Sequence, residues 1–232
     1  MPKILAIDSS TEACSVALFN DGDVVSRFEL APRKHAELLL PMVDSVLNEA
    51  GISLADLDAI ACCVGPGAFT GLRIAISIAQ GLAYAAQLPC IALSSLQILA
   101  AEAFNKTDSD ICFASIDARM KEVYFAAFKK DDCRLPEEIH SQQVIAAENI
   151  ELDFKIRADT KALKVGTGWD EYEYPDEVES VVTRPLKIKF PNAEMMLEIA
   201  LQHLKTKKLL KPEFLQPVYL RNNVAKKKSQ QN

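Results

Sequence analysis

The chain has 232 residues, of which 49% are apolar and 25% are charged, and its formal net charge is −6. This length and composition are typical of a soluble globular protein with one large domain or two small ones. They exclude a membrane-spanning chain, because no run approaches the roughly 20 apolar residues that a span needs, and the apolar stretch at 4–7 is too short for a signal peptide. We therefore expect a cytoplasmic protein without membrane contact.

Charge is distributed unevenly along the chain. Residues 184–232 hold 11 Lys or Arg and 3 Asp or Glu, a net charge of +8, so residues 1–183 carry −14. The basic C-terminal segment is either a solvated helix and tail or a surface for an acidic partner or nucleic acid. A chain that is acidic overall is not expected to hold RNA strongly by itself.

The cysteines show no Cys-x-x-Cys pair, and most of them lie in apolar runs. We interpret them as small, reduced core residues rather than disulfides or metal ligands. They are Cys14, Cys62, Cys63, Cys90, Cys112 and Cys133.

The first hundred residues alternate between strand-like and helix-like patterns. Three short strands joined by turns come first, and helices with an apolar face then alternate with continuous apolar runs typical of buried strands. The expected strands are 3–8, 14–20, 24–30, 59–64 and 90–93, and the expected helices are 35–50, 70–86 and 95–104. This order, β-β-β-α-β-α-β-α, is that of an RNase H-like half-domain.

A polar stretch at 105–110 predicts a boundary, with a first lobe over 1–104 and a second, smaller lobe over 105–232. The second half repeats the first only loosely, and residues 170–190 follow no clear pattern. After Pro212 we expect extended, poorly packed chain that ends in a basic tail. The elements expected here are strands at 111–116, 122–128 and 139–144, a strand that runs into a glycine-rich turn within 163–169, a short helix at 147–152 and a C-terminal helix at 193–208.

Asp8, Ser9, Ser10 and Thr11 follow the first strand. A carboxylate at such a position can hold hydrated Mg²⁺, and the hydroxyl and amide groups after it can cradle a phosphate. The alternative is a polar turn that closes a hairpin, and the local sequence favours this alternative.

The most distinctive stretch lies between a buried strand and a helix, where backbone amides favour anions. It matches neither the Walker pattern nor the dinucleotide pattern Gly-x-Gly-x-x-Gly. The alternative is a tight turn in which the glycines allow close backbone packing, and spacing alone leaves both open. The residues concerned are Gly65, Pro66, Gly67, Ala68, Phe69, Thr70, Gly71, Leu72 and Arg73.

The helix at 70–86 is rich in small residues. Gly81 in its middle costs about 1 kcal/mol relative to Ala, so we expect another helix to approach closely there, in the same chain or in another subunit. Metal chemistry is not expected, because no two of the three histidines have ligand spacing and the fourth residue after His35 is Leu39.

Together with Ser94-Ser95-Leu96, Asp117-Ala118-Arg119 and the segment 217–221, these motifs resemble the bacterial TsaB family, also called YeaZ. The resemblance spans nearly the whole chain, and its most specific part is Gly-Pro-Gly-x-Phe-Thr-Gly-Leu-Arg. It implies an α/β, two-lobed fold of the actin-like ATPase class (ASKHA, RNase H-like), with mixed sheets flanked by helices and a degenerate second lobe.

The resemblance also implies a function. Members are non-catalytic subunits that support TsaD, which transfers a threonylcarbamoyl group to the adenosine next to the anticodon in tRNAs that read codons beginning with A. The ATPase TsaE joins them, and tRNA is met only through the complex. A TsaB chain alone forms homodimers through the helices that correspond to 35–50 and 70–86.

Several expectations about sites follow from this resemblance. TsaD-like subunits bind metal through His-x-x-x-His, of which this chain keeps His35 only, and the second lobe lacks an Asp-x-Gly-Gly loop. Residues 8–11 would then be a vestigial nucleotide site, with no metal and no cofactor. Ala79→Glu is expected to abolish pairing and to leave the monomer folded. The expected contact residues are His35, Leu39, Val43, Leu47, Leu72, Ile76, Ala79 and Ala83.

An alternative function is an ATP-dependent phosphotransferase or hydrolase of the same fold that uses Asp8 for Mg²⁺. Independently of function, Asp117-Ala118-Arg119 either line the cleft between the lobes or form a solvated hairpin with internal ion pairs, and the sequence leaves both open. The absence of a second histidine disfavours a metallopeptidase.

Overall fold

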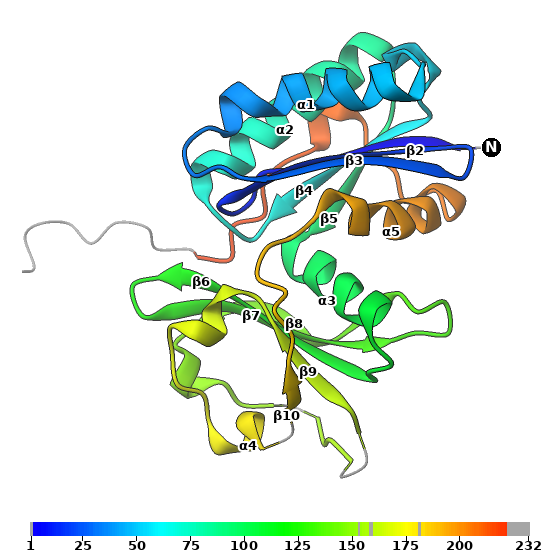
Figure 1. Cartoon of the computed structure of the whole chain (residues 1–232). Coiled ribbons are helices and arrows are strands. Elements are labelled where there is room, and N and C mark those ends of the chain that lie inside the picture. The colour runs from blue at the N-terminus through cyan, green and yellow to red at the C-terminus, as the bar shows by residue number, and fades with distance from the viewer. Residues whose placement is uncertain (1, 153, 158–159, 181, 222–232) are drawn as a thin grey trace, which may run out of the picture.

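Two lobes, each built on a five-stranded mixed sheet, lie one above the other (Figure 1). The computed structural model describes residues 2–152, 154–157, 160–180 and 182–221. The first sheet has the order β3-β2-β1-β4-β5, with antiparallel β1, β2 and β3 and with β4 and β5 parallel to β1. Its strands are β1 (Lys3–Asp8), β2 (Ala13–Asn20), β3 (Asp23–Leu30), β4 (Ala59–Gly65) and β5 (Cys90–Ser94).

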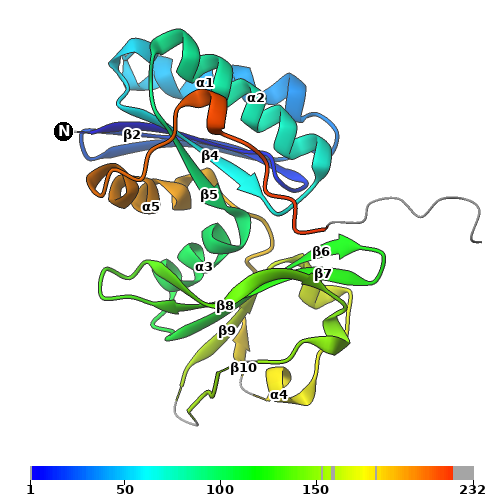
Figure 2. The same ribbon diagram turned by 180° about the vertical axis from the view of Figure 1, so that it is seen from behind.

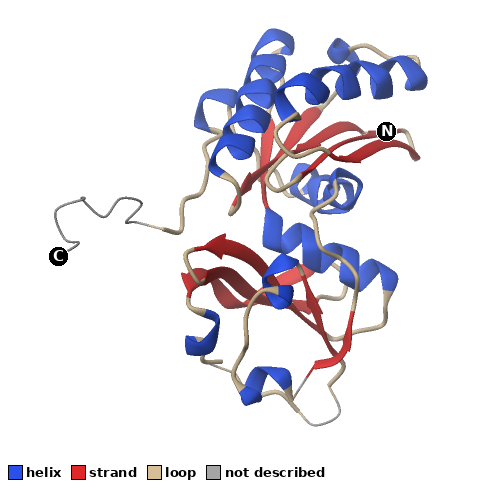
Figure 3. Ribbon diagram, turned by 60° about the vertical axis from the view of Figure 1, so that its left-hand side comes forward, coloured by secondary structure: helices blue, strands red, loops and turns tan. Residues whose placement is uncertain are grey.

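Helices cover both faces of this first sheet (Figure 3). Helices α1 (His35–Ala50) and α2 (Phe69–Ala86) pack on one face, against Leu5 and Ile7 of β1. Successive side chains of a strand point to opposite faces, so Ile4 and Ala6 meet the other face. The first-lobe order β-β-β-α-β-α-β-α is therefore confirmed.

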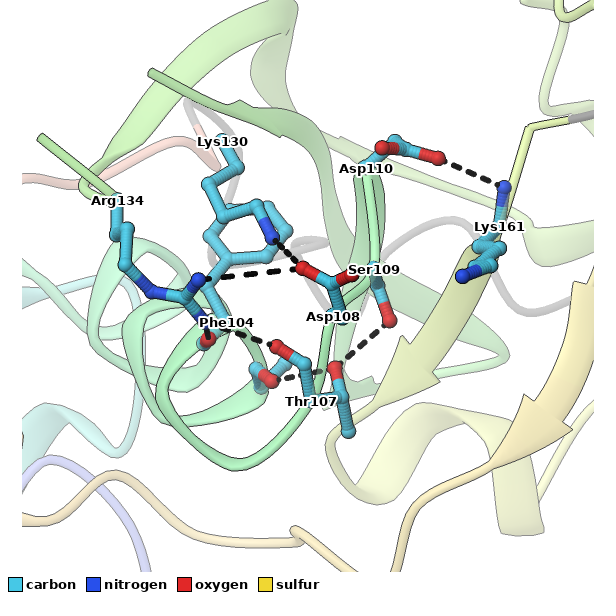
Figure 4. A network of polar contacts seen from close by, with 9 residues as sticks. Phe104, Thr107, Asp108, Ser109, Asp110, Lys130, Arg134 and Lys161 are labelled. Atoms are coloured by element: carbon cyan, nitrogen blue, oxygen red, sulfur yellow. Dashed lines mark hydrogen bonds and ion pairs between the residues drawn. The ribbon is translucent and has the colours of Figure 1, made fainter. Parts of the chain in front are cut away.

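Helix α3 (Ser95–Lys106) lies between the two sheets. Ile98 packs with the first lobe, whereas Leu96, Leu99 and Phe104 pack against the second sheet. Residues from the second lobe hold its C-terminal end, where helix carbonyls otherwise lack partners (Figure 4).

The contacts at this end of α3 form a polar network. Arg134 donates hydrogen bonds to the carbonyls of Phe104 (2.8 Å) and Thr107 (3.2 Å), and Asp108 pairs with Lys130 at 3.0 Å. The network fastens α3 to the second sheet.

The second sheet repeats the strand order of the first. Its order is β10-β9-β6-β7-β8, with antiparallel β6, β7 and β8 and with β9 and β10 in the parallel positions. Short 3₁₀ turns at Ala147–Asn149 and Thr167–Asp170 and the four-residue α4 (Asp176–Glu179) stand where the first lobe has long helices, so the second lobe is a degenerate copy. The strands are β6 (Ile111–Arg119), β7 (Glu122–Lys130), β8 (Pro136–Ile145), β9 (Ala162–Val165) and β10 (Val182–Pro185).

The C-terminal helix does not belong to the second lobe, so that prediction was wrong. Helix α5 (Ala193–Lys205) covers the free face of the first sheet, where Met196, Leu197 and Ile199 pack with Ala6. An apolar stripe predicts a helix, but it does not say which sheet the helix covers.

Residues 209–221, which we call the strap, also return to the first lobe. Leu210 exchanges two backbone hydrogen bonds with Cys90, at 2.8 and 2.9 Å, and Leu215 is fully buried. From Leu215 to Arg221 the chain is extended, as expected, and of these residues only Leu215 is buried, but Leu215 and the Val218 amide, which donates to the Val64 carbonyl, attach the strap to the first lobe. The basic tail beyond it lies outside the described residues.

Other expectations need smaller corrections. The predicted helix at 147–152 is only the 3₁₀ turn at Ala147–Asn149, and β10 lies in a stretch that showed no clear pattern. Five of the cysteines are buried as expected, whereas Cys133 is exposed. In the described part of the chain, no helix combines the length and apolarity that crossing a membrane requires.

Candidate functional site

Asp8 ends β1 and is completely buried, as are Ser9 and Ser10 beside it. The Ser10 amide donates to Asp8 Oδ1 at 3.0 Å, whereas Asp8 Oδ2 is buried without a hydrogen-bond partner. Because burial penalises the charged carboxylate, the pKa of Asp8 is raised above its ordinary value. The first three residues of the predicted site are thus enclosed, and Thr11 is 5% exposed.

The signature loop, residues 65–73, closes over this turn. The Ala68 amide donates to the Ser10 carbonyl at 2.7 Å, and the Ser9 hydroxyl donates to the Gly71 carbonyl at 2.9 Å. A Cβ atom at Gly67 would lie 2.2 Å from the Ser10 oxygen, and one at Gly71 would lie 2.0 Å from the Ser9 oxygen. Of the two interpretations of the loop, the structure has the tight turn with close backbone packing.

The loop and the turn do not fit the phosphate site that the fold class implies. The Ala68 amide, a donor that a phosphate would need, is here bonded to the Ser10 carbonyl. The carboxyl group of Asp8 lies beneath them and has no exposed surface.

A cleft of about 510 Å³ lies between the lobes, and Asp117, Ala118 and Arg119 line it, as do Ser10 and Thr11. The two interpretations of Asp117-Ala118-Arg119 hold together, because these residues line the cleft and also belong to the β6–β7 hairpin, in which exposed Arg119 pairs with Asp117.

The cations that line the cleft are each paired with a carboxylate. Arg119 contacts Glu12 at 3.4 Å and Asp117 at 3.2 Å, and Lys189 contacts Asp170 at 2.8 Å. Arg221 pairs with Glu122. The lining holds three basic and four acidic side chains, so its charge does not favour an anionic ligand.

The predicted contact residues on α1 and α2 need correction, because all eight are buried inside the monomer. Leu39, Ala79 and Ala83 have no exposed surface, and even His35, the one polar member, is only 8% exposed. The apolar stripe of each helix faces its own sheet, so Ala79→Glu would disrupt the fold rather than pairing alone. The full set is His35, Leu39, Val43, Leu47, Leu72, Ile76, Ala79 and Ala83.

The same two helices nevertheless present an outer surface, which we call the α1–α2 face. Leu40 is 46% exposed and Phe69 is 52% exposed. Their apolar character outside the core stripe is the signal in the sequence that could have identified them. The face consists of Ala36, Leu40, Phe69, Thr70, Arg73, Ile74, Ser77 and Ile78, which line a shallow groove.

Gly81 lies on the outer side of α2, beyond this groove. No atom of the described chain lies within 4 Å of the position where its Cβ would be. A close neighbour that would explain a glycine here is therefore not found within the described residues.

His35 Nε2 is buried without a hydrogen-bond partner, and Leu39 one turn later is part of the core. Within the described ranges, no three His, Cys, Asp or Glu side chains are grouped as a metal ion would require.

Comparison with known proteins gives a consistent assignment. The family model of TsaD, tRNA N6-adenosine threonylcarbamoyltransferase, matches residues 27–229. The chain is 44% identical to the tRNA threonylcarbamoyladenosine biosynthesis protein TsaB of Escherichia coli, over 97% of each chain. It is 40% identical to the Haemophilus influenzae protein of the same name, over 97% of this chain and 96% of the other.

Solved structures agree with this assignment. YeaZ from Pseudomonas aeruginosa superimposes with a TM-score of 0.84 at 38% identity, covering 95% of this chain and all of the other. A second Pseudomonas aeruginosa structure, of a protein described as similar to the peptidase YeaZ, gives a TM-score of 0.85 at 39% identity with the same coverage. The chain therefore belongs to the TsaB (YeaZ) family of tRNA threonylcarbamoyladenosine biosynthesis proteins.

Proposed function

We propose that, in tRNA threonylcarbamoyladenosine biosynthesis, this protein is a non-catalytic subunit that binds and supports TsaD together with TsaE. It contacts tRNA only through that complex, and in the absence of its partners it forms a homodimer. The observation that carries the proposal is the α1–α2 face, where Leu40 and Phe69 expose about half of their surface. Apolar side chains gathered on one exposed face are typical of a protein-binding surface.

TsaD is the partner that fits this face. The TsaD family model matches most of the chain, so TsaD is expected to present a related pair of helices. Helix α2 carries a single charged residue, Arg73, and Gly81 leaves room for a helix to cross at short distance. Such a surface favours close, mostly apolar packing between helices.

The non-catalytic part of the proposal rests on the closed turn at residues 8–11. Catalysis of phosphoryl transfer needs backbone donors and a metal-binding carboxylate that reach the phosphates. Here Ser9 and Ser10 are buried under the signature loop, and Asp8 lies below them.

Ser77→Glu tests the face, because Ser77 is exposed and its substitution leaves the core untouched. A close apolar contact would take the carboxylate at position 77 out of water, a cost that Arg73 one turn away offsets only in part, so affinity for TsaD should fall by about 100-fold or more. Ser141→Glu, the same substitution at an exposed position of β8, is the matched control.

Affinity is measured by calorimetry, and activity by threonylcarbamoyl transfer to tRNA with TsaD and TsaE present. Equal affinity of both variants for TsaD would refute the assignment of the face. Calorimetry with Mg-ATP tests the competing function. Tight binding by the isolated chain, with turnover that Asp8→Asn abolishes, would replace the proposal with a phosphotransferase or hydrolase.

A further inference from the structure

The strap joins three parts of the molecule that are distant in sequence. Figure 2 shows it running from the end of α5, past α2, toward the gap above β6. Gln80 of α2 donates to the carbonyls of Pro212 (3.1 Å) and Leu215 (2.9 Å). The Val218 amide donates to the Val64 carbonyl at 2.8 Å, immediately before the signature loop.

Its next contact is with the α1–α2 face. The Tyr219 ring stacks on Phe69 with 5.7 Å between ring centroids, and its hydroxyl accepts a hydrogen bond from Arg73 Nε at 3.0 Å. The Arg73 guanidinium lies 3.7 Å from the Phe69 ring centroid. Phe69 and Tyr219 are 52% and 45% exposed, so a partner on this face can cover the stack.

Two residues later the strap reaches the second lobe. Arg221 pairs with Glu122 and donates to the Arg119 carbonyl at 3.3 Å, so it grips the turn between β6 and β7. In this turn Arg119, Met120 and Lys121 all have left-handed φ angles, of 64°, 58° and 65°. Side chains disfavour that conformation, so the turn depends on contacts that hold it.

Both ends of this connection face the cleft, because Phe69, Tyr219, Arg119 and Arg221 all line it. We propose that the strap couples partner binding at the α1–α2 face to the conformation of the interlobe cleft. Partner binding stabilises the contacts between Arg221 of the strap and the β6–β7 turn. This rests on the proposed function, since it assigns the face to TsaD. Covering the Phe69–Arg73–Tyr219 stack removes it from water, which strengthens its cation–π contact and hydrogen bond and holds Arg221 in place.

Hydrogen exchange of the turn, residues 116–125, measures the coupling in the full chain with and without TsaD. In the native chain, TsaD should slow exchange of the turn by about fivefold, which corresponds to about 1 kcal/mol. Tyr219→Ala and Arg221→Gln should speed exchange in the free chain and abolish the effect of TsaD. Gln216→Ala, at an exposed position of the same strap, should behave as the native chain.

Calorimetry on the same samples separates the two proposals. If TsaD binds and exchange of the turn does not change, the coupling is refuted and the pairing stands. If Tyr219→Ala leaves the TsaD effect intact, the strap is not the connection. If the native chain binds no TsaD, the pairing itself is refuted and the coupling falls with it.

Discussion

Asp8 and Ser115 hold equivalent positions in the two lobes, each directly after the last strand residue that pairs with its parallel neighbour. Ser115 lies within β6, where a Cβ atom at Gly166 would lie 2.0 Å from its carbonyl oxygen, whereas the glycines of the first lobe approach Ser9 and Ser10 and not Asp8 itself. The Ser115 hydroxyl shares a hydrogen bond of 2.6 Å with the Tyr174 hydroxyl, whereas Asp8 Oδ2 has no partner. The buried acid is therefore the less well satisfied of the two.

Asp8→Asn should stabilise the protein at neutral pH. Because burial raises the pKa of Asp8 in the folded chain, the folded state holds this proton more tightly than the unfolded state. The native chain therefore loses stability as pH rises from about 3.9, the ordinary pKa of Asp, through the raised folded pKa. Asparagine keeps the acceptor for the Ser10 amide, so the variant should be more stable by about 1–3 kcal/mol at pH 7.

Urea unfolding between pH 3.5 and 8 measures this difference, which should vanish at the acid end. Asp108→Asn is a control of opposite sign. Lys130 lowers the pKa of the exposed Asp108 carboxyl, so replacing this carboxylate should destabilise the folded protein at pH 7. A difference for Asp8→Asn that does not change with pH would contradict the assignment of a raised pKa.

At the scale of elements, α2 contains two glycines, and the structure gives a different reason for the glycine at each position. Gly71, in the first turn, is needed because the Ser9 carbonyl occupies the space of a side chain, whereas Gly81 faces open space. Gly71→Ala should lower the free energy of unfolding by about 3 kcal/mol, as overpacking does. Gly81→Ala should raise it by about 1 kcal/mol through helix propensity, and should weaken pairing with TsaD.

Urea unfolding of the isolated chain compares the two variants, and calorimetry measures TsaD affinity. Equal effects of the two substitutions on stability would show that the close approach at Gly71 relaxes at little cost. Unchanged affinity of the Gly81→Ala variant for TsaD would show that the TsaD helix does not cross α2 at this position.

Local pattern was sufficient for the elements of the first lobe. Helix α1 begins at His35 and ends at Ala50 as expected, because its apolar stripe and the left-handed Gly51 (φ 67°) are encoded locally. The core stripe of a helix does not point to the residues proposed for partner contact, because it marks the side that faces its own sheet; their signal is the apolar character of Leu40 and Phe69 outside that stripe. The closed turn at Asp8 depends on residues more than fifty positions away, which no local pattern contains.

At the scale of the whole molecule, the two lobes exchange helices. Helix α3 follows the last strand of the first sheet and packs mainly on the second, whereas α5 follows the last strand of the second sheet and packs on the first. We therefore expect that the predicted lobe over 1–104 does not fold independently. Within residues 1–104, only Ile98 and Ala101 of α3 cover the face of the first sheet that contains Ile4 and Ala6, so most of that face is left exposed without α5.

A fragment of residues 1–106 should consequently fail to fold cooperatively. Its exposed sheet face should bind the dye ANS, and it should lack a sharp urea transition, because the apolar surface covered by α5 remains in contact with water. Adding a peptide of residues 190–221 should restore the transition. Cooperative unfolding of the fragment alone would show that α5 is dispensable for the first lobe.

The position of α5 also has a consequence for synthesis. The first sheet is complete in sequence at Ser94, but its cover ends only at Lys205. At 5–20 residues per second, a ribosome needs roughly 5–20 s to make the residues in between. During that interval the sheet face that α5 will cover is exposed, and it can bind chaperones or other nascent chains that are being made on the same mRNA.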